Sequence, residues 1–163
     1  MKKLFNVRSL VHSAFIAALY LALTGLANML GLANGVIQLR FSEALCVLPA
    51  FTPSAIWGLF IGCILSNFLT GAILPDIILG SLATLIGAVG TRLIRHHSRI
   101  ITIPPIVANV LIIPPVLAYI YKFEGSVLYF MITVGIGEIL SCGVLGSLLY
   151  KLLSKYKPIL FRE

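Results

Sequence analysis

The sequence predicts an all-α integral membrane protein, on the strength of its composition and the spacing of its charges. Apolar residues make up 60% of the chain, charged residues only 10%, and the mean hydropathy is +1.07. Soluble domains are typically about 45–50% apolar and about 25% charged. The charges also cluster, so that residues 44–75 form an uncharged tract of 32 residues. Because one membrane-spanning helix needs about 20 apolar residues, residues 1–163 are expected to form a single membrane domain.

Glycine, asparagine and proline residues divide the apolar tracts into six expected transmembrane helices. Their approximate bounds are 9–30, 38–49, 54–71, 76–94, 102–121 and 126–150. The second is the shortest, and Pro49 and Pro53 close it. A proline inside a helix removes a backbone hydrogen bond, so one continuous helix through this region is not expected.

The basic residues predict how the chain lies in the membrane. Ten of the twelve precede the first helix, separate the fourth from the fifth, or follow the sixth: Lys2, Lys3, Arg8, Arg92, Arg95, Arg99, Lys151, Lys155, Lys157 and Arg162. An excess of lysine and arginine marks cytoplasmic loops. Both termini are therefore expected to be cytoplasmic, in a multi-pass protein of the cell (cytoplasmic) membrane, surrounded by the lipid bilayer. This placement accounts for the net charge of +7 without a nucleic-acid partner.

Glu138 lies at the centre of the sixth expected helix and is the sole charged residue within positions 125–150. A charge at that depth costs roughly 2.5–3.5 kcal/mol on insertion scales, and ionisable residues inside membranes usually mark a functional site. We therefore interpret Glu138 as a ligand-binding residue. The structural alternative is a hydrogen bond from a neighbouring helix.

Other unusual polar residues fall in the outer half of the expected helices. Arg40 and Glu43 lie at the start of the second, Asn67 near the end of the third, Asp76 at the start of the fourth and Tyr119 at the end of the fifth. This clustering by depth predicts a ligand pocket that faces the outside of the cell.

Each of these residues also has a structural alternative. Asp76 follows Pro75 at a helix start, where aspartate is a favoured N-cap. Arg40 and Glu43 are three residues apart and suit a mutual ion pair. Tyr119 lies where an aromatic belt is expected.

Two further patterns concern packing. Asn109 precedes Pro114 and Pro115, which free backbone carbonyls, and it is a candidate to satisfy one of them. Small residues recur every four positions in the first helix (Ala14, Ala18, Ala22) and in the third (Gly58, Gly62, Ser66). Such rows let helices approach closely in the bilayer. We expect the third-helix row to pack inside the fold, and the alanine row to offer a docking face for a membrane partner.

The sequence does not predict an enzyme. Its three histidines, His12, His96 and His97, all fall at the expected cytoplasmic edge, away from the membrane carboxylates. No metal-binding spacing accompanies them. The phosphate-binding pattern GxxxxGK[ST] is absent, so we expect no cofactor on this chain.

Residues 37–88 carry a motif set that resembles a known family. The matching positions are Arg40-Phe41-Ser42-Glu43-Ala44-Leu45, Leu48-Pro49, Gly58-Leu59-Phe60-Ile61-Gly62-Cys63, Asn67, Asp76 and Gly80-Ser81-Leu82-Ala83-Thr84-Leu85. They resemble the QueT family of predicted queuosine-precursor transporters, which are substrate-binding S components of energy-coupling-factor (ECF) transporters.

The resemblance implies a fold and a set of partners. It implies the six-helix S-component fold, a membrane-embedded T component as partner, and two cytoplasmic ATPases that hydrolyse ATP. Members of the superfamily often dock through an alanine-rich face of the first helix, which Ala14, Ala18 and Ala22 match here. The alternative function is a stand-alone secondary carrier of small molecules or a non-catalytic membrane scaffold.

The implied ligand suits the candidate residues. A 7-deazaguanine such as queuine, or its 7-aminomethyl or 7-cyano precursor, presents N1–H and a 2-amino group side by side, and one carboxylate accepts from both. The aminomethyl form adds a cation for a second carboxylate. Glu138 and Glu43 are the main candidates. Asn67 and Asp76 come next, with Arg40 and Tyr119 also assigned to the site.

Overall fold

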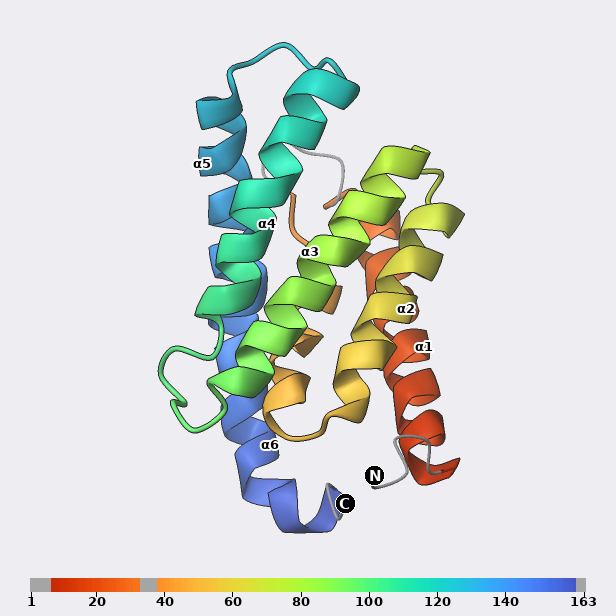
Figure 1. The fold of residues 1–163 in the computed structure, drawn as a ribbon, viewed down its shortest axis with the longest axis vertical. Coiled ribbons are helices and arrows are strands. Elements are labelled where there is room, and N and C mark those ends of the chain that lie inside the picture. Colours follow the sequence, from red (N-terminus) through yellow and green to blue (C-terminus); the bar gives the residue numbers. More distant parts are fainter. Residues whose placement is uncertain (1–6, 33–37, 161–163) are drawn as a thin grey trace.

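The computed structural model describes residues 7–32 and 38–160, which form helices that run roughly along one long axis, with no strand (Figure 1). In chain order they are the helices α1 (Val7–Met29), α2 (Ser54–Leu69), α3 (Leu74–Leu93), α4 (Ile103–Pro115), α5 (Val127–Glu138) and α6 (Ser147–Leu160), the 3₁₀ helix η1 (Phe41–Ala50) and the π-helical segments η2 (Val116–Ile120) and η3 (Ile139–Gly146). The predicted all-helical fold is confirmed.

Four helical stretches are long and apolar enough to cross a membrane. They are Val7–Met29, Leu74–Leu93, Ile103–Ile120 and Val127–Tyr156. Helix α2 has 16 residues, about 24 Å at 1.5 Å per residue, against a hydrocarbon core about 30 Å thick. The last stretch runs well beyond the expected end at residue 150, because α5, η3 and α6 follow one another without a break.

The segment predicted as the second transmembrane helix is the 3₁₀ helix η1, which lies inside the bundle. Eight of its ten residues are buried. It packs closely on η3, since a Cβ atom at Gly146 would lie 3.2 Å from Val47 and 3.4 Å from the carbonyl oxygen of Ala44. A regular α-helix was not expected at Pro49. The structure has a 3₁₀ helix there, and this helix forms part of the buried core.

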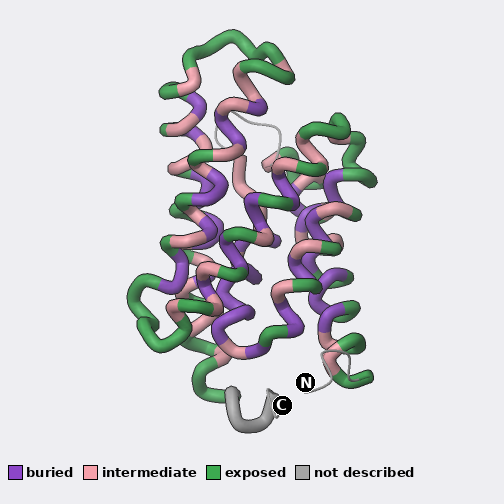
Figure 2. The backbone as a smooth tube through the Cα atoms, viewed as in Figure 1, coloured by how far each residue is buried: buried purple, intermediate pink, exposed green. Residues whose placement is uncertain are grey.

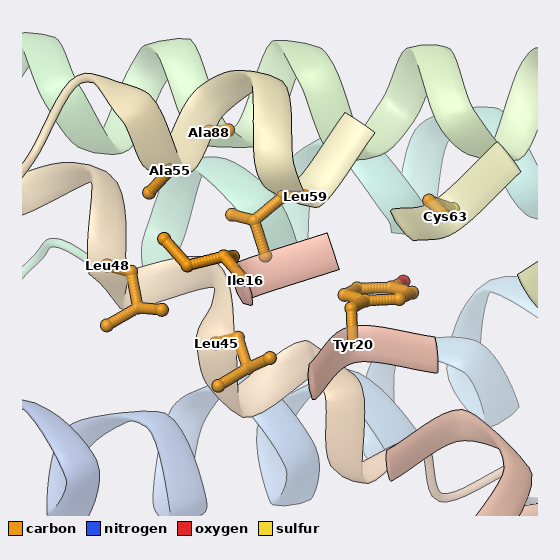
Figure 3. Packing of buried hydrophobic residues seen from close by; sticks show 8 residues of the cluster. All are labelled: Ile16, Tyr20, Leu45, Leu48, Ala55, Leu59, Cys63 and Ala88. Carbon is orange, nitrogen blue, oxygen red and sulfur yellow. The ribbon is translucent and has the colours of Figure 1, made fainter. Parts of the chain in front are cut away.

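Helices α1 and α2 pack backbone to backbone through the predicted glycine row. A Cβ atom at Gly58 would lie 2.7 Å from the carbonyl oxygen of Ser13, and one at Gly62 would lie 2.9 Å from the Cβ of Tyr20. Figure 3 shows the core around this contact, where Tyr20 and Leu59 are buried together. The expectation that this row packs inside the fold is confirmed.

The alanine row lies on the other face of α1. Ala14, Ala18 and Ala22 are exposed, whereas Ile16 and Tyr20 on the same helix are buried. Figure 2 shows the same division along the bundle, with buried residues toward the inside. The described chain therefore leaves the alanine face of α1 uncovered.

The two ends of the bundle differ in charge. One end of the bundle holds the start of α1, the connection from α3 to α4, and the end of α6 (Figure 1). The basic side chains at this end are Arg8, Arg92, Arg95, Arg99, Lys151 and Lys155. We call it the basic end. At the opposite end α2 turns into α3, and η2 leads into α5.

Candidate functional site

A cavity of about 760 Å³ opens at the end of the bundle opposite the basic end. Its walls are the last turns of α1 and α2, the first turns of α3, the end of α4 with η2, and the segment that precedes η1. The polar residues that line it are Thr24, Asn28, Gln38, Arg40, Ser66, Asn67, Thr70, Asp76 and Tyr121. Ligand cavities typically measure about 300–1,000 Å³, so this one is large enough for a single purine-sized molecule.

Asp76 is held in the cavity wall by a tyrosine. It lies in the first turn of α3, whose N-cap is Ile73 and has no side-chain capping bond. Its Oδ2 accepts a hydrogen bond from the hydroxyl of Tyr121 at 3.0 Å. The alternative that Asp76 serves as an N-cap is thus not what the structure shows. A carboxylate in this first turn also interacts favourably with the helix dipole.

Arg40 and Glu43 do not pair. Glu43 is 2% exposed, and its two oxygens accept from the hydroxyl of Tyr20 at 2.7 Å and the thiol of Cys46 at 3.1 Å. Arg40 precedes η1 in an extended conformation, and its backbone N–H donates to Ser141. Within residues 7–32 and 38–160 no ion pair joins them. Arg40 lines the cavity, and Glu43 lies in the core beside it.

Asn67 lies at the end of α2 and is 5% exposed while still lining the cavity. Its amide nitrogen lies 3.6 Å from the sulfur of Cys63. A Cβ atom at Gly80 would lie 3.2 Å from that nitrogen, so the absence of a side chain at Gly80 leaves room for Asn67 to reach the cavity.

Glu138 lies deeper than the cavity. It is 8% exposed, and its Oε2 has no hydrogen-bond partner in the described chain. The side chain of Asn109 is its neighbour. Asn109 is 5% exposed, and its amide nitrogen likewise has no partner among the described residues. That nitrogen therefore donates to none of the carbonyls freed by the prolines at the end of α4, contrary to the expectation.

Comparison with known proteins decides the family. The model of the QueT transporter family matches residues 10–155. The chain belongs to the QueT transporter family. A curated relative, the queuosine precursor transporter QueT of Lactococcus lactis subsp. cremoris (strain MG1363), is 39% identical over 77 residues. The match covers 47% of this chain and 45% of the relative, so the chain spans about half the length of the curated relative. No solved structure matches.

Family membership and four membrane-capable helices make this QueT-family chain a multi-pass membrane protein of the cell membrane. The predicted motif residues fall on η1, α2 and α3 or, for Arg40, directly before η1. Three of them, Arg40, Asn67 and Asp76, line the cavity. In the described part of the chain, no three His, Cys, Asp or Glu side chains lie together as metal ligands would.

One tyrosine of this QueT-family protein lies elsewhere than expected. Tyr119 is 73% exposed and does not line the cavity, whereas Tyr121 does. The backbone N–H of Ile73 lies 3.5 Å from the Tyr121 hydroxyl. Partial burial, and then the nearby Asp76 carboxylate, raise the pKa of Tyr121. The phenol therefore stays a hydrogen-bond donor at neutral pH.

The sequence-based assignment of the site left out six polar residues of the cavity: Thr24, Asn28, Gln38, Ser66, Thr70 and Tyr121. Thr24 and Asn28 are four residues apart near the end of α1, which places them on one helical face. That spacing was a readable signal. Gln38 carried none, because an isolated polar residue before a helix is equally typical of a loop.

Proposed function

We propose that this QueT-family chain is the substrate-binding S component of an ECF-type importer that takes up a queuosine precursor. The cavity is the single observation that carries the proposal. It holds a carboxylate, a guanidinium and a carboxamide, from Asp76, Arg40 and Asn67, in a bundle that is mainly apolar. Such polar side chains in apolar surroundings are typical of small-molecule sites. The substrate named for the curated relative, a queuosine precursor, has groups that match them.

The ligand pairs its charged group with Asp76 at the cavity wall. A 7-aminomethyl or queuine side chain carries a cation, and the Tyr121 hydroxyl leaves Asp76 Oδ1 as the oxygen that can meet it. Asn67 both donates and accepts, which suits the edge of a deazapurine. Glu138, one layer deeper, accepts from N1–H and the 2-amino group. Glu43 supports the site from the core, and Tyr121 takes the wall position expected for Tyr119.

The orientation follows from the charge at the two ends. With the basic end in the cytoplasm, the cavity at the opposite end of the bundle faces outward, as an importer's receptor requires. Both termini are then cytoplasmic. The transported molecule enters from outside and reaches Asp76 and Arg40 first.

Transport itself requires partners. This chain binds substrate and no cofactor, while a membrane T component and two ATPase subunits supply ATP hydrolysis. The exposed alanine face of α1, formed by Ala14, Ala18 and Ala22, is the docking surface for the T component. Small side chains suit close helix approach in lipid.

Two measurements test this proposal. The purified chain is titrated with 7-aminomethyl-7-deazaguanine, 7-cyano-7-deazaguanine and queuine, with thiamine, biotin and riboflavin as controls. We expect saturable binding of a deazapurine alone. Uptake is then measured in cells with and without the ATPase subunits. Binding of a control vitamin would overturn the assignment of a queuosine precursor as the substrate. Uptake that persists without the ATPase subunits would show that the chain is a stand-alone carrier.

A further inference from the structure

Two neighbouring side chains beneath the cavity have complementary unused groups. Among residues 7–32 and 38–160, the amide N–H of Asn109 on α4 finds no hydrogen-bond acceptor, and one carboxyl oxygen of Glu138 on α5 finds no donor. The Asn109 amide lies close enough to the Glu138 carboxyl group to interact with it, but neither atom makes a hydrogen bond of ordinary distance and angle within the described residues. On α3, the buried hydroxyl of Ser81 also has no partner in the part of the chain that the structure describes. Such orphans are rare in the interior of a folded protein.

An unused donor beside an unused acceptor calls for a molecule with an acceptor beside a donor. A buried polar group left unpaired is costly, so two adjacent ones favour a shared partner. A purine-type lactam has this order on one edge, with a 6-oxo acceptor, then N1–H, then a 2-amino group. An adenine-type edge begins with a donor and continues with an acceptor, so it would meet both side chains with the wrong groups.

The pair lies within reach of the cavity. Ile113 and Leu117 of α4 line the cavity, and Asn109 lies four residues before Ile113, on the same helical face and one turn deeper. Helix α3 runs alongside, since a Cβ atom at Gly80 would lie 3.8 Å from Ile113 and 3.7 Å from Asp76. Asn109 therefore lies behind Ile113 as seen from the cavity, and a ligand reaches Asn109 only if the Ile113 side chain moves aside.

We propose that Asn109 is a specificity-determining residue of the substrate site, whose amide N–H donates to the 6-oxo group of a purine-type lactam. Glu138 accepts from the adjacent N1–H and 2-amino groups. Selection is for the lactam edge, and the charged end of the ligand remains at Asp76. This inference rests on the proposed function and assigns recognition of the 6-oxo group to Asn109.

A pair of ligands tests the proposal on the unaltered protein. Affinity for 7-aminomethyl-7-deazaguanine is compared with that for its 6-thioxo analogue, which keeps N1–H and the 2-amino group but has a much weaker acceptor. We expect the wild-type protein to bind the oxo ligand at least fivefold more tightly. Equal affinities would show that no side chain reads the 6-oxo group and would overturn the assignment of Asn109.

Two variants then locate the reader of the 6-oxo group. In Asn109→Leu, which keeps the volume and removes the donor, we expect at least tenfold weaker oxo binding and loss of the oxo-over-thioxo preference. Thr133→Val is the matched control. Thr133 is buried on α5, and its hydroxyl donates to the carbonyl of Phe130. Its removal is expected to leave both affinities unchanged.

The outcomes separate this inference from the proposed function. If Asn109→Leu binds both ligands like the wild type, Asn109 does not read the edge, while the substrate assignment survives. If the wild type binds no deazapurine, the proposed function and the inference both fail. Helical content and melting temperature are measured for each variant. The ligand comparison on wild-type protein gives its result even if Asn109→Leu does not fold.

Discussion

The hydroxyl of Tyr121 donates to Oδ2 of Asp76 at 3.0 Å and ties the chain just after η2 to the first turn of α3. The bond joins residues 45 positions apart in the wall of the cavity. It holds one carboxylate oxygen and leaves the other for a ligand. Tyr121 therefore positions Asp76, and this role can be measured apart from any direct contact.

Removing the Tyr121 hydroxyl is expected to weaken ligand binding. A hydrogen bond to a charged group contributes about 1.5–3 kcal/mol, and the lower value applies at this partly exposed site. Tyr121→Phe should reduce the affinity for 7-aminomethyl-7-deazaguanine by about tenfold, measured by calorimetric titration. Tyr119→Phe is the control, because Tyr119 is 73% exposed and does not line the cavity. A larger loss of ligand affinity in Tyr119→Phe than in Tyr121→Phe would contradict the placement of Tyr121 in the cavity wall.

The pH dependence of that contact has a definite sign. The pKa of Tyr121 is raised, first by partial burial and then by Asp76. The protonated Tyr121 hydroxyl stabilises the fold through its hydrogen bond to Asp76. Because the pKa of Tyr121 is raised in the folded protein, this stabilisation is fully present below the pKa of tyrosine in the unfolded chain, near 10. It is lost as the pH rises through the pKa of Tyr121 in the folded protein. The binding difference between wild type and Tyr121→Phe should stay constant from pH 7 to about pH 9. It should narrow only above pH 10. Narrowing near neutrality would mean that another group controls binding.

Glu43 is expected to act on the fold more than on the ligand. Both its oxygens are engaged, by Tyr20 and Cys46. Tyr20→Phe removes one donor from a buried carboxyl group, and an unsatisfied group of this kind costs about 1–3 kcal/mol. We expect a melting temperature several degrees lower in detergent, with ligand affinity within about twofold of the wild type. A large loss of ligand affinity at unchanged stability would show that Glu43 acts on ligand binding and not mainly on the fold.

The glycine row predicts a strong effect of one methyl group. A Cβ atom at Gly62 would meet Tyr20 at 2.9 Å and the Ala17 backbone at 3.1 Å, so Gly62→Ala forces α1 and α2 apart. Overpacking of this kind typically costs about 1–3 kcal/mol. Gly25→Ala is the control, since no atom of the described residues lies within 4 Å of its Cβ position. Alanine there is expected to stabilise by up to about 1 kcal/mol. Thermal unfolding followed by circular dichroism distinguishes the two.

The alanine face of α1 predicts a selective loss of assembly. Ala14→Trp with Ala18→Trp places bulk on an exposed face, away from the cavity. We expect ligand binding by the isolated chain to persist and co-purification with the T component and ATPases to be lost. Ile132→Trp, at an exposed position on α5, is the control and should assemble normally. Normal uptake by the double variant would remove this face from the interface.

Sequence patterns predicted how deep the polar residues lie in the membrane better than they predicted which way the side chains point. Counting residues along helices of known rise placed Arg40, Asn67 and Asp76 near the same end, and all three line one cavity. The same counting could not choose between Tyr119 and Tyr121. Two residues apart, they point toward roughly opposite sides of the helix. Their depths are nearly equal, and only the packing of η2 against its neighbours decides which one faces inward.

The family, the membrane class and the helical segments followed from the sequence alone, because hydrophobicity, charge spacing and short motifs are local properties. The tertiary structure decided which polar groups satisfy one another. Glu43 takes its partners from Tyr20 and Cys46 instead of Arg40, and Asn109 comes to lie beside Glu138 instead of capping a proline-freed carbonyl. These pairings depend on how each helix is rotated about its axis. That rotation is set by close contacts such as those of Gly58, Gly62 and Gly146, which act between segments far apart in the chain.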